Sequence, residues 1–174
     1  MLDNTPIYAR QRSHIVLERL HTFKSHIMAQ AFPQAVLISD LVGRATEFTV
    51  AYSLLTFPRT TTRPPDWPRY FLLSHSIELS LKAFLAARGK TSVELREEFG
   101  HDLKKLLKEA INCGLVMGSD ARKDIALLEK AHNHHWARYP KEDSTPIVAI
   151  EEFEETAVEL LAQVRKTIYP AIST

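Results

Sequence analysis

Apolar side chains recur every three or four positions along most of this chain, and no segment of useful length alternates polar and apolar residues as a β-strand would. This spacing places the apolar residues on one face of an α-helix. Only five glycines are present, and the nine prolines cluster between the periodic segments. We therefore expect an all-α fold, an up-and-down bundle of five to six helices around one core.

The apolar stripes, together with prolines and glycines, set the expected helix boundaries. Pro33 is expected to separate the first two helices, and the prolines after residue 57 predict a loop at 58–67. Thr91 and Glu94 have the spacing of a capping box. The expected helices cover residues 10–30, 34–57, 68–89, 102–112, 120–138 and 153–168.

The chain has 174 residues, the size of one domain, and a formal net charge of +1, so it has no overall attraction to nucleic acid. Cys113 is the only cysteine, which excludes an intramolecular disulfide. The first residues do not resemble a signal peptide, and no apolar run approaches the ~20 residues of a membrane helix. We expect a cytoplasmic protein without a membrane segment.

Glu78 and Lys82 are the polar residues in the middle of the most apolar segment. Their spacing of four places them on one face of a helix, in the favourable order. One interpretation is a partly exposed structural ion pair, which contributes under ~1 kcal/mol. The other is a polar pocket that further charged residues reach.

Two other segments carry candidate polar residues. Asp102 is favoured at the start of a helix by the helix dipole, and His101 before it either closes the turn or contributes to an anion site. Arg138 ends a later helix, and Tyr139 must leave the helical region because Pro140 follows. The Arg138 guanidinium suits a phosphate or a carboxylate. If these helix ends converge, one cleft holds Lys82, Arg138, His101 and Glu78.

Metal and cofactor motifs are absent from the sequence. His132, His134 and His135 lie close together, but no Cys, Asp or Glu has the spacing of a further zinc ligand. No phosphate-binding glycine loop, dinucleotide turn or nucleophile elbow occurs. We expect neither a metal nor a cofactor.

Three motifs in order resemble the HEPN family: residues 75–85 with Glu78, Lys82 and Ala83, then Gly100-His101-Asp102-Leu103, then Arg138-Tyr139-Pro140. The similarity covers about 35–168. The resemblance implies that residues 1–174 form a single HEPN-like domain. Residues 10–30 are then an added helix, and residues 35–168 form the core bundle. It also implies a homodimer, for which we expect a helix-on-helix interface above ~1,200 Å² in total.

The resemblance implies roles in toxin–antitoxin or antiviral systems, in nucleotide binding, or beside a nucleotidyltransferase partner. Many members are ribonucleases that use Arg and, after four to six residues, His near the start of the fourth helix. Here Arg122 has no His at that distance. We therefore expect a non-catalytic domain that binds a nucleotide, RNA or another anion, or docks a partner protein.

The site residues expected for this role are Glu78, Lys82, His101, Asp102, Arg138 and Tyr139. One alternative is a metal-independent ribonuclease that uses Arg69 and His75, which have the right spacing but lie on the second helix of the family. The other is a purely structural dimerisation module.

Overall fold

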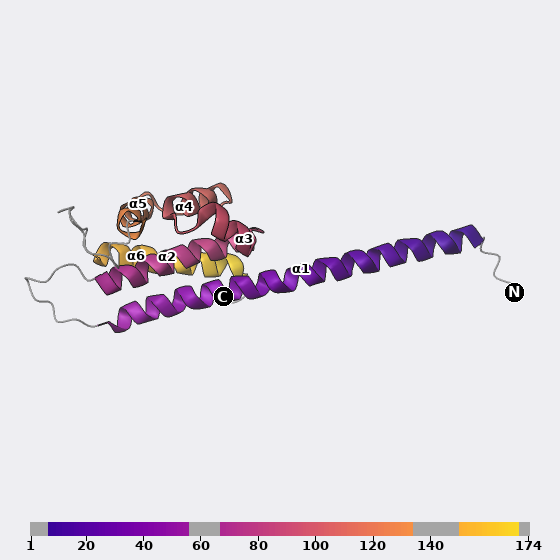
Figure 1. Ribbon diagram of the computed structural model, residues 1–174, viewed down its shortest axis with the longest axis horizontal. Coiled ribbons are helices and arrows are strands. Elements are labelled where there is room, and N and C mark those ends of the chain that lie inside the picture. Colours follow the sequence, from indigo (N-terminus) through magenta and orange to yellow (C-terminus); the bar gives the residue numbers. More distant parts are fainter. Residues whose placement is uncertain (1–6, 56–66, 134–149, 171–174) are drawn as a thin grey trace, which may run out of the picture. The chain divides into compact units, whose positions relative to one another are not determined.

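The computed structural model describes residues 7–55, 67–133 and 150–170, and all regular elements in these ranges are helical. The all-α prediction is therefore confirmed. The elements are α1 (Ile7–Leu54), α2 (Trp67–Ala87), α3 (Ser92–Glu94), a π-helical segment η1 (Leu95–Phe99), α4 (Leu103–Asn112), α5 (Ser119–Asn133) and α6 (Glu151–Ile168), as Figure 1 shows.

The expected break at Pro33 is wrong. Pro33 lies inside α1, which continues to Leu54, and it is exposed. Proline fixes φ near the helical value, so it removes one hydrogen bond and crowds the preceding turn without forbidding a helix. On an exposed position the carbonyl group that loses its partner can turn toward water.

The chain divides into two compact units, residues 1–36 and 37–174. In the first unit, the described structure is the N-terminal part of α1. The second unit contains the rest of α1 and all the other helices. The division falls close to the predicted start of the core bundle at residue 35.

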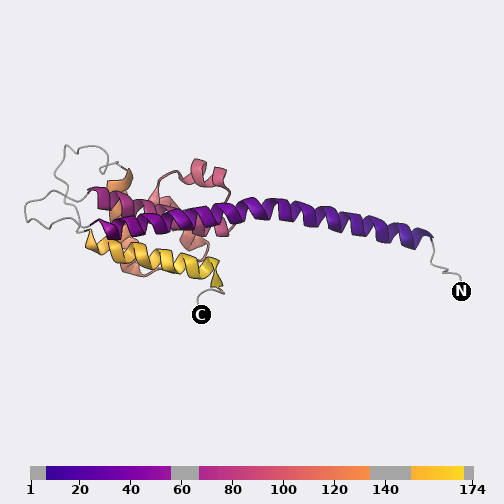
Figure 2. The same ribbon diagram turned by 90° about the horizontal axis from the view of Figure 1, so that it is seen from below.

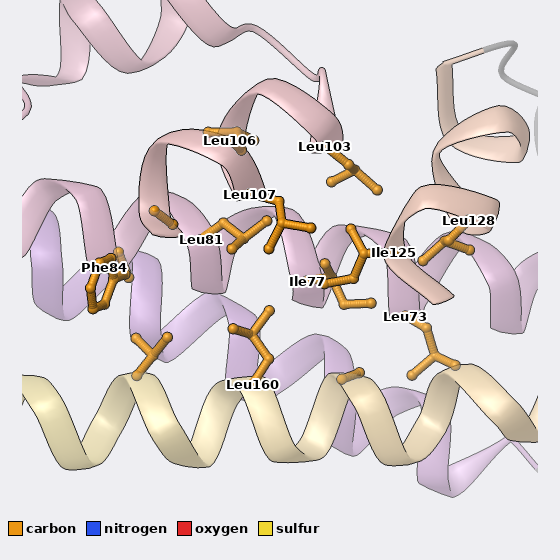
Figure 3. Close-up of a cluster of buried hydrophobic side chains, with 14 of the residues drawn as sticks. Leu73, Ile77, Leu81, Phe84, Leu103, Leu106, Leu107, Ile125, Leu128 and Leu160 are labelled. Atoms are coloured by element: carbon orange, nitrogen blue, oxygen red, sulfur yellow. The ribbon is translucent and has the colours of Figure 1, made fainter. Parts of the chain in front are cut away.

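Helix α2 is the centre of the second unit. It lies beside α6, as both Figure 1 and Figure 2 show, and it also packs against α4, α5 and η1. Leu73, Ile77 and Leu81 of α2 are fully buried. Figure 3 shows Leu81 and Ile77 between Leu160 of α6 and Leu107 of α4, and Leu73 next to Leu128 of α5. Each such side chain contributes roughly 1.5–3 kcal/mol when it leaves water, so α2 must form for the core to form.

The part of α1 from residue 37 packs against α2 through small polar groups. The Ser76 hydroxyl group donates to the Ala45 carbonyl oxygen at 3.0 Å and lies 2.7 Å from the Thr49 hydroxyl group. These contacts keep the buried Ser76 hydroxyl group hydrogen-bonded.

The local predictions between α2 and α4 are confirmed. Gly89, with φ of 98°, follows the end of α2. Thr91 and Glu94 form a reciprocal capping box at α3. The turn at Gly89 and the capping box at Thr91 lie between α2 and η1, and η1 leads to the start of α4.

Candidate functional site

A buried carboxylate lies in the middle of α2. The Glu78 side chain is 4% exposed, and Lys82, one turn later, places its Nζ 2.7 Å from Glu78 Oε1 with 13% of its side chain exposed. Both side chains are therefore more buried than the partly exposed ion pair of the first interpretation. Removing a carboxylate from water requires compensating partners, and the lysine supplies one.

The second partner of Glu78 is His101. Its Nδ1 lies 3.0 Å from Oε1 and 3.1 Å from Oε2 of Glu78. Gly100, with φ of 53°, allows the turn that precedes it. The His101 side chain is nevertheless 64% exposed. Glu78, Lys82 and His101, which we call the Glu78 cluster, thus join a buried carboxylate to a solvent-facing imidazole.

Asp102 lies next to this cluster but serves α4. Its side chain accepts a hydrogen bond from the Lys105 backbone N–H at 2.9 Å, which makes it the N-cap of α4. An N-cap carboxylate satisfies an otherwise unpartnered amide and interacts favourably with the helix dipole. The Asp102 side chain therefore caps α4, whereas the side chain of its neighbour His101 contacts Glu78.

A second buried carboxylate joins α4 and α5. Lys104 Nζ lies 2.8 Å from Glu129 Oε2, and the Glu129 side chain is 9% exposed. The hydrogen bond to Glu129 raises the pKa of the Lys104 ammonium group. The sequence does not predict this pair, because the two residues are 25 positions apart and neither belongs to a motif.

A third cluster lies where α1, α2 and the start of α6 meet. The Tyr52 hydroxyl group accepts a hydrogen bond from Arg69 Nη2 and donates one to Glu154 Oε2 at 2.8 Å. The Arg69 guanidinium group also lies 4.4 Å from the centre of the Tyr52 ring. Tyr52 is 1% exposed. We call these three residues, Tyr52, Arg69 and Glu154, the Tyr52 cluster. The sequence does not predict their contacts, because its periodicity indicates only that Tyr52 is a core residue.

The alternative catalytic pair, Arg69 and His75, makes separate contacts. Arg69 belongs to the Tyr52 cluster, whereas His75 Nδ1 lies 3.0 Å from the Phe71 carbonyl oxygen. The imidazole ring of His75 also packs on Phe71 and Phe48, with centroid distances of 4.0 Å and 5.4 Å. A ribonuclease needs its cation and its base at one phosphate, and for Arg69 and His75 this arrangement stays a prediction.

Several predicted residues lie outside the part of the chain that the structure describes. They are Arg138, Tyr139, His134 and His135, and the His132 side chain is outside it as well. The convergence of Arg138 with Lys82 therefore stays a prediction. Within the described residues, no group of three or more His, Cys, Asp or Glu side chains is placed to hold a metal ion.

The comparisons with known proteins find no relative for this chain. No protein-family model, no curated protein and no solved structure matches it. Among the described helices, none is both long enough and apolar enough to span a membrane.

Proposed function

We propose that the second unit, residues 37–174, is a non-catalytic HEPN-like binding domain whose ligand is anionic, such as a nucleotide or an RNA phosphate. The observation that carries the proposal is that the buried Glu78 carboxylate orients Lys82 and a His101 ring that is 64% exposed. The Lys82 ammonium group and the exposed His101 ring are the members of this cluster that can donate a hydrogen bond to a phosphate oxygen.

The His101 imidazole ring is the contact that we expect for the phosphate. Helix starts often bind phosphate through unpartnered amides. At α4 the Asp102 carboxylate already occupies that position, since it accepts the Lys105 N–H. A phosphate placed at those amides would meet a carboxylate, so the exposed ring of His101 offers the more favourable contact.

The resemblance supplies the remaining parts of the proposal, which are a homodimer, a nucleotidyltransferase-type partner and a place in a toxin–antitoxin system. A purely structural role for the Glu78 cluster is the competing interpretation. It predicts no response to ligand at all.

The test is thermal unfolding with inorganic phosphate, sulfate and AMP, each added up to millimolar concentration. A ligand at ten times its dissociation constant stabilises the folded state by about 1.4 kcal/mol, which corresponds to a rise of roughly 3–6 °C in the melting temperature for a domain of this size. We expect this rise to be lost in His101→Gln and weakened in Lys82→Gln. If the wild-type melting temperature does not change, the anion site is refuted.

The matched control is Lys105→Gln. Lys105 lies on the first turn of α4, and its side chain is 65% exposed. The variant also removes one positive charge, so it reveals any unspecific charge effect. An equal loss of the phosphate response in Lys105→Gln and His101→Gln would contradict a site at His101. Cleavage of a labelled RNA in the presence of a metal chelator would contradict the non-catalytic proposal and favour Arg69 and His75.

A further inference from the structure

The outer side of α4 carries basic side chains whose acidic partners are much less exposed than they are. The Lys104 side chain is 59% exposed, whereas that of Glu129, its partner from α5, is 9% exposed. His101, just before α4, repeats the arrangement, since its side chain is 64% exposed and that of Glu78 is 4% exposed. In both pairs the basic group is therefore the one that a molecule arriving from solvent meets first.

Lys108 extends this row of basic groups along α4. It is exposed, and it lies four positions after Lys104, which places both lysines on the same side of the helix. Four residues of α-helix span about 6 Å along the axis, so the two ammonium groups can contact different phosphate groups of one strand. We call His101, Lys104 and Lys108 the α4 basic row.

The acidic residues on α4 and at its start lie to the side of the α4 basic row. Glu109 is partly buried, and its position is about 100° round the helix from Lys108. Asp102 is the N-cap of α4, and its side chain, 28% exposed, lies 3.7 Å from the Lys105 ammonium group. Lys105 does not belong to the row, because its partner carboxylate is accessible from solvent and offsets its charge there.

The exposed side of α4 is polar throughout. The structure describes every residue of this helix, and the exposed ones are three lysines and Asn112. A helix that lies on a membrane needs an apolar face toward the lipid, and the centre of a protein interface is depleted of charged residues. The phosphate backbone of a nucleic acid needs only cations and hydrogen-bond donors. The exposed side of α4 therefore suits a phosphate backbone better than a membrane or a protein.

We propose that the α4 basic row binds the phosphate backbone of a nucleic-acid strand, with one phosphate group at His101 and Lys82 and the next ones at Lys104 and Lys108. The inference rests on the proposed function, because it extends the anion site at His101 along α4 and identifies the ligand as a strand. The formal net charge is only +1, so the whole chain does not attract nucleic acid. Binding then depends on these local contacts.

The experiment measures binding of the full chain to a short labelled oligouridylate by fluorescence anisotropy at several salt concentrations. With contacts from Lys82, Lys104 and Lys108, the slope of log K against log salt concentration should be about −2, because each phosphate contact on a single strand contributes about −0.7. Lys108→Gln should change the slope to about −1.4 and weaken binding roughly eightfold at about 50 mM salt. The matched control is Lys166→Gln, which removes an exposed lysine from α6 and should change neither quantity.

Two further ligands identify the chemistry that the α4 basic row recognises. An oligothymidylate of the same length should bind with the same slope, because the contacts are to phosphate groups. A poly-glutamate peptide should bind much more weakly, and equal binding of peptide and RNA would identify an acidic protein partner and overturn the proposal. If phosphate raises the melting temperature but Lys108→Gln leaves the oligouridylate slope unchanged, the α4 basic row is wrong and the anion site stands. If the wild type responds to neither phosphate nor oligouridylate, both are refuted.

Discussion

Two polar clusters share helix α2 but differ in which member is withdrawn from water. In the Glu78 cluster the carboxylate is buried and the histidine is mostly exposed. In the Tyr52 cluster the phenol is buried and is held between a guanidinium group and a carboxylate. The difference separates two roles. A polar group that is enclosed on all sides stabilises the packing of helices. A carboxylate that orients an exposed ring is, in our proposal, also able to position that ring for a ligand.

The largest effect that we expect is from Tyr52→Ala. Removing a fully buried aromatic side chain lowers the free energy of unfolding by about 3–5 kcal/mol, measured by urea denaturation. Tyr52→Phe keeps the ring and removes the hydrogen bonds to Arg69 and Glu154, for which we expect a loss of about 1–3 kcal/mol. The phosphate response should survive in Tyr52→Phe. If this variant loses the response, the two clusters are not separate in role.

Glu78→Gln is expected to have an intermediate effect. The substitution preserves the shape of the side chain but leaves Lys82 without a charged partner, which lowers the free energy of unfolding by about 1–3 kcal/mol. Because Lys82 is 13% exposed, it retains some hydration, and the lower part of this range is expected.

A double-mutant cycle with Lys82→Met measures the coupling between the two side chains. An energy of interaction near zero would mean that the Glu78–Lys82 contact contributes nothing to stability. The contrast with the Tyr52 cluster would then rest on His101 alone.

The smallest change in the free energy of unfolding is expected at an exposed carboxylate, Glu94. It serves as a reference for the effects at the two buried clusters. The hydrogen bond from the Thr91 backbone N–H, followed by that from the Thr91 hydroxyl group, lowers the pKa of Glu94. A carboxylate with a lowered pKa in the folded state stabilises the protein above its ordinary pKa, and this contribution is lost as the pH falls through the folded-state value.

We therefore expect Glu94→Gln to be slightly less stable than the wild type at pH 7 and equal to it at low pH, measured by urea denaturation at both values. A difference that stays constant between neutral and low pH would show that the Glu94 charge plays no part in the capping box.

What could be predicted from the sequence lies within a turn or two of the chain. The helices between Trp67 and Asn112, the capping box at Thr91 and the Glu78–Lys82 pair all follow from spacing. Each depends on contacts between residues at most four positions apart, and helix geometry determines those contacts in advance.

What only the tertiary structure decided is which distant groups meet. His101 lies 23 positions from Glu78 and Glu154 lies 102 from Tyr52, and no local pattern pairs either of them. The continuity of α1 through Pro33 is another such outcome. The physical reason is the same in these cases: side-chain periodicity determines which face of a helix is apolar, whereas the packing of the helices determines what each polar group on the edge of that face encounters.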